Sequence, residues 1–283
     1  MRILAPAKLN LSLDILRRRP DGYHDLRMVM HSVGLTDILD LERTGEAGVR
    51  VTTDLSFLPG NEKNLAARAA LAYAAATGES ADGLRIRIQK KIPVCAGMAG
   101  GSSDAAAVLR ALNAQSADPL TVAELARVGE QVGSDVPYCV LGGTVLAEGR
   151  GEVLTPLSPL PECFFVLCKP PFPISTPELF GRVNCQKLRC RPDTEGIRKA
   201  LEAGDLNGVA RRMYNVFEDV LSPRQAVVIQ RIKTTLIGCG ALGAVMSGSG
   251  PTVFGIFGDE PAARRAAETL KEDYTDVFLA KSV

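Results

Sequence analysis

Residues 93–113 read PVCAGMAGGSSDAAAVLRALN, and this stretch decides how the rest of the chain is interpreted. A proline opens it, glycines and other small residues follow, and Ser102, Ser103 and Asp104 stand directly before an alanine-rich run. Apolar residues of that run recur on one helical face. We expect the end of a strand, a glycine-rich loop and a helix, with Ser or Asp at the N-cap of the helix.

This arrangement is typical of an anion site. Glycines let the backbone come close to a ligand, and the N–H groups and dipole at the start of a helix attract negative charge. The loop is not a Walker A loop, because no Gly-Lys-Ser/Thr closes it, and its glycine spacing is not that of a dinucleotide fingerprint. We interpret it as a site for nucleotide phosphates. The alternative is a glycine-rich turn before an ordinary buried helix.

Composition limits the class of protein. The chain has 283 residues, 46% of them hydrophobic, and a net charge of +1. One large or two moderate domains are expected. The charge balance predicts no nucleic-acid partner and no basic membrane patch, and no apolar stretch approaches the roughly 20 residues of a membrane span. Met1 runs straight into a strand-like segment, so we expect no signal peptide and a cytoplasmic protein.

Cysteine usage agrees with a reducing compartment. The seven cysteines are scattered, with no Cys-x-x-Cys pair, and we expect free thiols. Cys185 and Cys190 could form half of a zinc site, but the two histidines of the chain lie far upstream. Neither histidine has a context that marks it as the base of a catalytic thiol.

The N-terminal segment alternates polar and apolar residues. Over residues 3–15 this period of two predicts a strand with Lys8 and Asn10 on the same face. Either these side chains lie on a solvated face, or they point together into a cleft. A Pro-Asp-Gly turn at 20–22 is followed by Tyr23 and His24, which can stack on and hydrogen-bond a planar ring, or pack at a hairpin corner.

The remaining elements are expected from periodicity and turn signals. Predicted strands cover residues 26–41 (two strands, broken near Gly34 and at 36–37), 49–53, 84–89, 144–148, 152–155, 163–169, 241–246, 252–257 and 277–281. Predicted helices cover residues 61–77 (capped by Asn61), 121–132 (capping box Thr121 and Glu124), 177–183, 194–203, 206–214, 223–236 and 260–273.

Two turns carry possible chemistry. Gly-Ser-Asp-Val-Pro at 133–137 either caps an element with Asp135 or displays that carboxylate at a rigid corner. Ser-Gly-Ser-Gly-Pro at 247–251 is a hairpin or a second phosphate loop. A proline-rich stretch at 157–161 predicts a boundary between domains 1–158 and 159–283. Strands and helices mix without regular alternation, which indicates an α+β protein with a cleft between two domains.

Several motifs now coincide. They are Ala-Pro-Ala-Lys-Leu-Asn at 5–10, Asp-Gly-Tyr-His at 21–24, the loop at 93–106, the turn at 133–137 and Met-Ser-Gly-Ser-Gly-Pro-Thr at 246–252. In this order, along nearly the whole chain, they resemble the GHMP kinase superfamily. The first two motifs resemble, within it, the kinases that act on the cytidine diphosphate of methylerythritol.

The resemblance implies a two-domain GHMP kinase fold of the α+β class. Its N-terminal phosphate-loop domain would be ribosomal protein S5 domain 2-like, and its smaller C-terminal α/β domain ferredoxin-like. It implies an ATP- and Mg²⁺-dependent enzyme that phosphorylates the 2-hydroxyl of 4-diphosphocytidyl-2-C-methyl-D-erythritol, in the non-mevalonate (MEP) route to isoprenoids and terpenoids.

The resemblance also assigns residues. Asp135 and Lys8 match the pair that flanks the reacting hydroxyl, with Asp135 as general base. Tyr23 and His24 match residues that hold cytosine, with Phe180 on its other face, and Asn10 and Thr176 match polar contacts to the substrate. The hydroxyl of Ser102 or Ser103 could reach the Mg²⁺ ion. The positions that match the ATP site are Pro93, Val94, Cys95, Ala96, Gly97, Met98, Ala99, Gly100, Gly101, Ser102, Ser103, Asn64 and Leu65.

Three positions depart from the family pattern. Met98 replaces the usual Leu and Ala99 replaces a Gly found in many members, while Met30 replaces a Phe found in some. The first swap conserves volume, and the second narrows the conformational freedom of the loop. Two rival interpretations are another kinase of the superfamily, such as a homoserine or mevalonate-type kinase, and a non-catalytic GHMP-fold protein that binds nucleotide.

Overall fold

A computed structural model describes all residues from Met1 to Val283. The chain forms two compact units, each drawn from separate parts of the sequence. Unit 1 consists of Met1–Ala7, Thr36–Val94 and Ala99–Gly142, and unit 2 of Lys8–Leu35, Cys95–Met98 and Gly143–Val283. The predicted domains 1–158 and 159–283 divide the chain by sequence position alone and stay a prediction.

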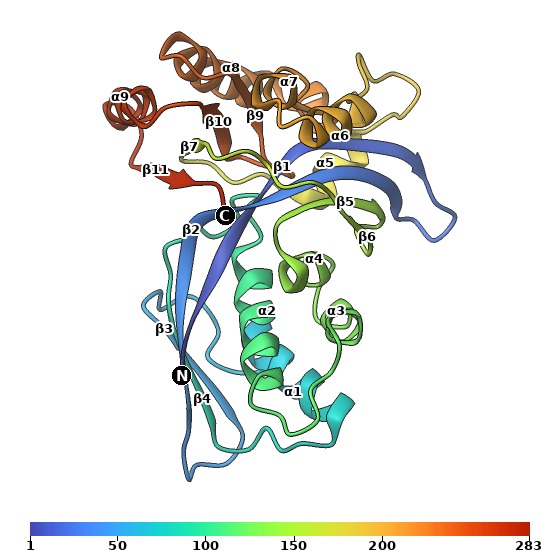
Figure 1. Ribbon diagram of the computed structural model, residues 1–283, viewed down its shortest axis with the longest axis vertical. Helices are drawn as coiled ribbons and strands as arrows, with labels where there is room; N and C mark the ends of the chain where they lie inside the picture. Colours follow the sequence, from blue (N-terminus) through green and yellow to red (C-terminus); the bar gives the residue numbers. More distant parts are fainter. The chain divides into compact units, whose positions relative to one another are not determined.

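Unit 1 is a small sheet covered by helices. Strand β4 (Leu84–Gln89) lies between β3 (Val49–Thr53), its parallel neighbour, and the second half of β2 (His24–Arg43), its antiparallel neighbour. The side chains of β4 alternate between buried and more exposed, as the period of two predicts. The helices α1 (Leu65–Thr77), α2 (Gly100–Asn113), α3 (Val122–Glu130) and α4 (Val136–Leu141) pack along one side of these strands (Figure 1).

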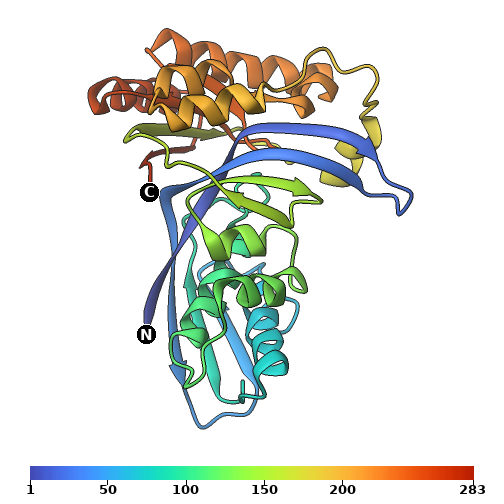
Figure 2. The same cartoon turned by 45° about the vertical axis from the view of Figure 1, so that its right-hand side comes forward.

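Unit 2 contains a four-stranded antiparallel sheet in the order β11-β7-β10-β9. Its strands are β7 (Phe164–Lys169), β9 (Gly243–Met246), β10 (Val253–Phe257) and β11 (Asp276–Lys281). The helices α8 (Pro223–Gly238) and α9 (Glu260–Lys271) cover one face of this sheet in both views (Figures 1 and 2).

The remaining elements of unit 2 include residues 8–18, the second part of a long strand. Strand β1 (Arg2–Arg18) pairs in parallel with the short β8 (Tyr214–Asn215), and the first half of β2 pairs with the hairpin of β5 (Thr144–Gly149) and β6 (Val153–Pro156). The other elements are α5 (Thr176–Arg182), α6 (Thr194–Glu202), α7 (Leu206–Arg211) and the 3₁₀ helix η1 (Val216–Val220).

Most predicted elements are present, and the differences have local causes. Residues 26–41 form one strand instead of two, because Gly34 and Asp37 are accommodated in extended backbone. Asn64 caps α1 in place of Asn61, accepting from the N–H of Ala66 at 3.0 Å. The buried face of α1 is Ala66, Ala67, Ala69, Ala70 and Tyr73.

Three short elements were not predicted, namely α4, β8 and η1. The corner at 133–137 leads into α4, whose six residues are too few to show a helical period. The helix expected over 206–214 ends at Arg211, because Tyr214 joins β1 as part of β8. The predicted capping box of α3 is confirmed, with Thr121 and Glu124 each accepting from the backbone N–H of the other. None of the helices combines the length and hydropathy that crossing a bilayer requires.

Candidate active site

The two ends of the glycine-rich loop lie in unit 1. Helix α2 begins at Gly100, so Ser102, Ser103 and Asp104 lie inside the helix, and the prediction that one of them is the N-cap is wrong. Ala99 occupies the N-cap position in the left-handed conformation, with φ 54° and ψ 31°, and no side chain caps the helix. The N–H groups at the start of α2 therefore have no side-chain acceptor, which suits an anion.

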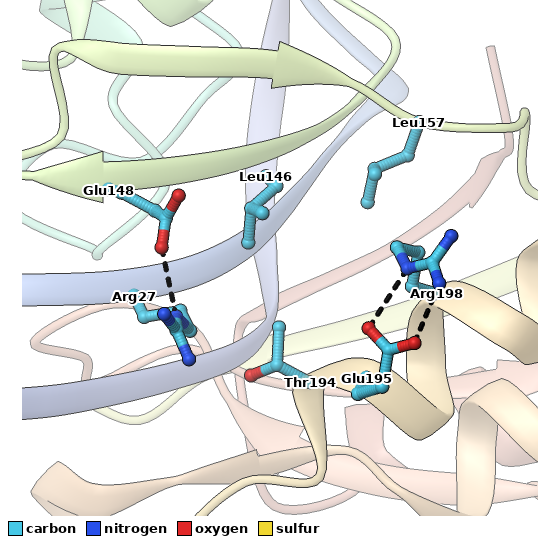
Figure 3. Close-up of a pocket in the computed structure, with 7 residues that line it drawn as sticks. All are labelled: Arg27, Leu146, Glu148, Leu157, Thr194, Glu195 and Arg198. Carbon is cyan, nitrogen blue, oxygen red and sulfur yellow. Dashed lines mark hydrogen bonds and ion pairs between the residues drawn. The ribbon is translucent and has the colours of Figure 1, made fainter.

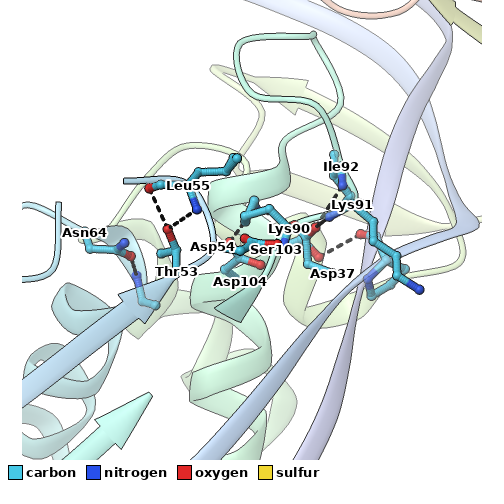
Figure 4. Close-up of polar contacts among 12 residues, drawn as sticks. Asp37, Thr53, Asp54, Leu55, Asn64, Lys90, Lys91, Ile92, Ser103 and Asp104 are labelled. Carbon is cyan, nitrogen blue, oxygen red and sulfur yellow. Dashed lines mark hydrogen bonds and ion pairs between the residues drawn. The ribbon is translucent and has the colours of Figure 1, made fainter. Parts of the chain in front are cut away.

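Three charged side chains gather beside these ends (Figure 4). The Nζ of Lys90 donates to Oδ2 of Asp37 and, at 2.7 Å, to Oδ2 of Asp104. The side chain of Lys90 is 4% exposed, that of Asp37 0% and that of Asp104 5%. We call Asp37, Lys90 and Asp104 the charged cluster. It holds one positive and two negative groups away from water, which is stable only because the charges are paired.

Burial and charge change the pKa values in this cluster. Burial raises the pKa of Asp104 to about 7, although the ammonium of Lys90 opposes the rise. Burial by itself would lower the pKa of Lys90, but the carboxylates of Asp104 and Asp37 outweigh burial and raise it. Lys90 therefore stays charged, while Asp104 can take up a proton near neutral pH.

Asn64 and Leu65, expected on the adenine side, lie next to the first turn of α2. A Cβ added to Gly101 would lie 3.3 Å from Cδ1 of Leu65, so the side chain of Leu65 packs beside Gly101. The amide of Asn64 caps α1 and donates to the carbonyl of Pro59 at 2.9 Å. Within unit 1, the structure thus brings both residues to the exit of the loop.

Unit 2 holds the middle of the loop, Cys95–Met98, against the second glycine loop. The hydroxyl of Ser247 donates to the carbonyl of Gly97 at 3.0 Å and accepts the N–H of Asn10 at 3.3 Å. The Nζ of Lys8 donates to Oδ1 of Asn10 at 2.7 Å. Lys8 is 5% exposed and Asn10 0%, so of the two alternatives for this face of β1 the solvated face is wrong.

Asn215 holds the second glycine loop from the other side. Its amide nitrogen donates to the carbonyls of Met246 at 2.7 Å and Gly248 at 2.8 Å, and its amide oxygen accepts the N–H of Phe217 at 3.0 Å. We call Asn10, Asn215 and Ser247 the neutral network. The bonds that Asn215 and Ser247 make to the two loops end on backbone carbonyls, so these side chains fix the path of the main chain.

Two glycines are required where the loops meet. A Cβ on Gly97 would lie 2.3 Å from the carbonyl oxygen of Ser247, and one on Gly248 would lie 3.0 Å from the carbonyl oxygen of Gly97. Both residues have positive φ, +76° and +55°. This close approach explains why both loops are glycine-rich inside unit 2.

The residues expected around cytosine form an aromatic corner in unit 2. The rings of His24 and Phe180 stack with centroids 4.9 Å apart and an interplanar angle of 19°, and Phe217 meets Phe180 edge-on. Tyr23 is 59% exposed, with the guanidinium of Arg150 5.4 Å from its ring centroid. The ring that faces Phe180 is thus that of His24, and not that of Tyr23.

The polar groups of Thr176 and His24 are the next predicted substrate contacts. The hydroxyl of Thr176, the first residue of α5, lies 2.7 Å from the hydroxyl of Ser249 in the second glycine loop. Burial lowers the pKa of His24, and the positive charge of Arg18 lowers it further, so the imidazole is neutral at pH 7. A neutral imidazole offers one donor and one acceptor to a polar ring.

Asp135 lies at the turn before α4 and is half-buried. Its side chain makes no capping hydrogen bond, so helix capping does not explain an acid at this position. Asp135 belongs to unit 1 and Lys8 to unit 2, and their pairing around a reacting hydroxyl stays a prediction.

A separate pocket of about 330 Å³ lies in unit 2 (Figure 3). None of the predicted site residues lines it. Arg27 pairs with Glu148 at 3.0 Å and Arg198 with Glu195 at 2.6 Å, so both cations of the pocket are already neutralised. The remaining lining residues are Leu146, Leu157 and Thr194.

Sequence reasoning missed Asp37, Lys90, Asn215 and Ser247 as members of buried polar clusters. Asp37 was interpreted only as a break between strands, and Asn215 came directly after an expected helix. A lysine three residues before the proline of a glycine loop was the one available signal. It was not used, because its partners lie 53 and 14 positions away in the sequence.

Comparison with known proteins agrees with these features. The family of the GHMP kinases N terminal domain matches residues 64–143, and that of the GHMP kinases C terminal domain matches residues 197–276. The chain is 42% identical to the 4-diphosphocytidyl-2-C-methyl-D-erythritol kinase of Alkaliphilus metalliredigens, covering 100% of this chain and 96% of the relative. It is 41% identical to the kinase of the same name from Clostridium botulinum (strain Eklund 17B / Type B), with 100% of both chains covered.

Solved structures give the same result. A crystal structure of 4-(cytidine 5'-diphospho)-2C-methyl-D-erythritol kinase has a TM-score of 0.84 and 34% identity, covering 99% of this chain and 98% of that one. A homoserine kinase from Cytophaga hutchinsonii has a TM-score of 0.77 at 21% identity, covering 100% and 94%, which shows the fold alone. The predicted α+β, two-domain GHMP kinase fold is thereby confirmed.

The chain therefore belongs to the GHMP kinases and, within them, to the family of the 4-diphosphocytidyl-2-C-methyl-D-erythritol kinases.

Proposed function

We propose that this protein transfers the γ-phosphoryl group of ATP to the 2-hydroxyl of 4-diphosphocytidyl-2-C-methyl-D-erythritol, giving the 2-phosphate and ADP in the MEP route to isoprenoids. The observation that carries this proposal is identity above 40%, along the whole chain, to relatives named for this kinase activity. The sequence-based expectations of a cytoplasmic location and of no nucleic-acid partner belong to the same proposal.

Phosphoryl transfer depends mainly on positioning and on stabilisation of charge. The triphosphate would lie at the start of α2, where no side chain competes for the N–H groups. The dipole of a 14-residue helix adds a positive potential at the same place. Asn64 and Leu65 beside this turn would contact the adenosine.

The acceptor hydroxyl must lose a proton as the new P–O bond forms. We assign Asp135 as the general base that takes this proton on a carboxylate oxygen. The ammonium of Lys8 would stabilise the developing alkoxide. Asn10 supports this role, because its amide oxygen accepts from Nζ of Lys8 and orients that group.

The cytidine end would be recognised at the aromatic corner. A base between Tyr23 and Phe180 requires the imidazole of His24 to leave the face of Phe180, where it now stacks. The displaced imidazole could then hydrogen-bond the base, while Thr176 contacts the substrate from the start of α5. A site that pairs polar groups in this way rejects a base that leaves them unpaired.

Magnesium would accompany the nucleotide. No three His, Cys, Asp or Glu side chains gather into a metal site. Mg²⁺ needs only one or two protein oxygens besides phosphate and water, so this donor set fits an ion that arrives with ATP. The hydroxyl of Ser103 already donates to the carbonyl of Pro6 at 2.7 Å, which favours Ser102 as the group that holds the ion. The bound ion would neutralise phosphate charge.

The decisive experiment measures ADP release from MgATP with the cytidine substrate, with its uridine analogue, and with homoserine and mevalonate as alternative acceptors. We expect turnover only with the cytidine substrate. Turnover with homoserine or mevalonate would overturn the substrate assignment, and equal use of the uridine analogue would overturn the aromatic corner.

The base is tested by Asp135→Asn in the same assay. We expect kcat to fall about 10²–10⁴-fold, while binding of a non-hydrolysable ATP analogue changes little. Normal turnover of this variant would show that another group takes the proton.

A further inference from the structure

Lys90 connects the two ends of the glycine-rich loop. We call residues 90–92 the entrance of the loop and the start of α2, residues 100–104, its exit. Lys90 directly follows β4 and precedes Pro93 by three positions, and its Nζ bridges Asp37 of β2 to Asp104 of α2. Figure 4 shows the three side chains pointing toward one another. Both carboxylates are buried, so nothing but this ammonium is seen to balance their charge in the interior.

The entrance of the loop is held by Asp37. Its Oδ1 accepts the backbone N–H of Lys91 at 2.5 Å and of Ile92 at 2.8 Å, the two residues immediately before Pro93. The backbone N–H of Lys90 donates to Asp54 at 3.0 Å. Three consecutive peptide groups at the entrance are therefore held by carboxylates.

The exit is held by the same ammonium. Asp104 is the fifth residue of α2, and Gly100, the first residue of the helix, packs directly on the entrance. A Cβ at Gly100 would lie 3.1 Å from Cγ2 of Ile92 and 3.4 Å from Nζ of Lys90. Entrance and exit thus touch, and one ion pair crosses between them.

We propose that Asp37, Lys90 and Asp104 are positioning residues for the phosphoryl donor, which close the ends of the glycine-rich loop so that its N–H groups are preorganised for the triphosphate. This inference rests on the proposed use of ATP. The cluster touches no reacting atom. It acts by removing the entropy cost of ordering the loop when nucleotide binds.

The test uses the full-length chain and three variants. Lys90→Met removes the ammonium that bridges Asp37 and Asp104, and Asp104→Asn keeps the side-chain shape but weakens the bridge. Lys90→Arg restores a cation that can bridge the two carboxylates. Val128→Ala removes buried methyl groups of α3 without touching the cluster and serves as the matched control. Calorimetry gives the Kd of a non-hydrolysable ATP analogue, and steady-state assays give KM for each substrate and kcat.

We expect Lys90→Met to raise both the Kd of the analogue and the KM for ATP about tenfold or more, with the KM of the alcohol substrate within about twofold. Asp104→Asn should show a smaller rise, and Lys90→Arg should recover part of the loss. Should Lys90→Met fail to fold, Asp104→Asn carries the same test.

The inference is overturned if the variants leave nucleotide binding unchanged, or if they raise the KM of the alcohol substrate as much as the KM for ATP. It is also overturned if Val128→Ala raises the Kd of the analogue as much as Lys90→Met. A wild-type chain that binds the analogue but does not use the cytidine substrate overturns the proposed substrate alone, because the binding measurements still test the cluster. A wild-type chain that does not bind the analogue overturns both.

Discussion

Two buried polar clusters hold parts of one glycine-rich segment, and they do so by different physics. In unit 1 the charged cluster of Asp37, Lys90 and Asp104 ties the ends of the segment through ion pairs. In unit 2 the neutral network of Asn10, Asn215 and Ser247 holds the middle of the segment and the second glycine loop through hydrogen bonds to backbone groups.

The difference teaches what each cluster can tolerate. A buried ion pair that loses one partner leaves an unpaired charge, which is costly in a medium that solvates it poorly. The loss of a neutral hydrogen bond leaves a buried polar group without a partner, which costs less free energy than a buried unpaired charge. The charged cluster is therefore sensitive to protonation and to loss of charge, whereas the neutral network is sensitive mainly to shape.

The largest expected effect comes from removing the cation of the charged cluster. Lys90→Met should lower the free energy of unfolding by about 3–5 kcal/mol at pH 8, because two buried carboxylates lose their partner. At pH 6 the loss should be smaller, since protonation relieves the repulsion. Asn215→Ala should cost about 2–3 kcal/mol at both pH values. Urea unfolding measures the loss of stability of each variant at pH 6 and at pH 8. A loss from Lys90→Met that is the same at both pH values would contradict the distinction between the charged cluster and the neutral network.

The next effect is the pH dependence of stability. Burial raises the pKa of Asp104 to about 7, so between about pH 4 and 7 the folded state holds a proton that the unfolded chain has released. The free energy of unfolding therefore falls as the pH rises through this range. It falls by at most about 1.4 kcal/mol per pH unit.

His31 in unit 2 has the opposite slope. Burial lowers its pKa to about 4, so between about pH 4 and 6.5 the unfolded chain holds a proton that the folded state lacks. Its contribution to stability rises with pH and partly cancels that of Asp104 in the wild type. In Asp104→Asn the free energy of unfolding should rise with pH, because only the contribution of His31 remains. In His31→Gln it should fall with pH, because only the contribution of Asp104 remains. Urea titrations between pH 4.5 and 7.5 measure both, and an Asp104→Asn profile parallel to the wild type would refute the assignment.

The neutral network can be probed through shape alone. Gly97→Ala places a Cβ 2.3 Å from the carbonyl oxygen of Ser247, whereas Gly204→Ala, at a similar φ of +64°, meets nothing within 4 Å. We expect Gly204→Ala to cost about 1 kcal/mol for its backbone conformation, and Gly97→Ala about 2–3 kcal/mol with loss of nucleotide binding. Thermal unfolding and calorimetry measure the two effects, and equal costs would mean that the loops move apart freely.

The smallest expected effect compares two strained positions. Ala99 in unit 1 and Cys95 in unit 2 have φ values of +54° and +53° without being glycine. Replacement of either residue by glycine removes about 1–2 kcal/mol of backbone strain from the folded state. It also costs about 0.5–1 kcal/mol, because glycine gives the unfolded chain more conformational entropy to lose on folding. Ala99→Gly and Cys95→Gly should each stabilise the protein by about 0.5 kcal/mol in thermal unfolding. Destabilisation of either variant would show that its side chain has a packing role.

Local patterns were sufficient for most elements of the fold. The alternation in residues 84–89 predicted β4 with its observed bounds, and the pair Thr121 and Glu124 predicted the start of α3. Such patterns succeed because backbone hydrogen bonding and capping involve residues close in the sequence. They failed at α4, which is too short to show a period, and at β2, where turn-like residues lie inside one long strand.

By itself, the sequence determined the glycine loops, the motif residues and, through their resemblance to a family, the class of enzyme. Only the tertiary structure decided that Lys8 and Asn10 are buried, that His24 stacks on Phe180, and that Lys90 bridges two carboxylates. Burial and pKa depend on partners that chain topology brings together from distant positions. No local periodicity records those partners, because the same alternation of residues is compatible with a solvated face or a buried one.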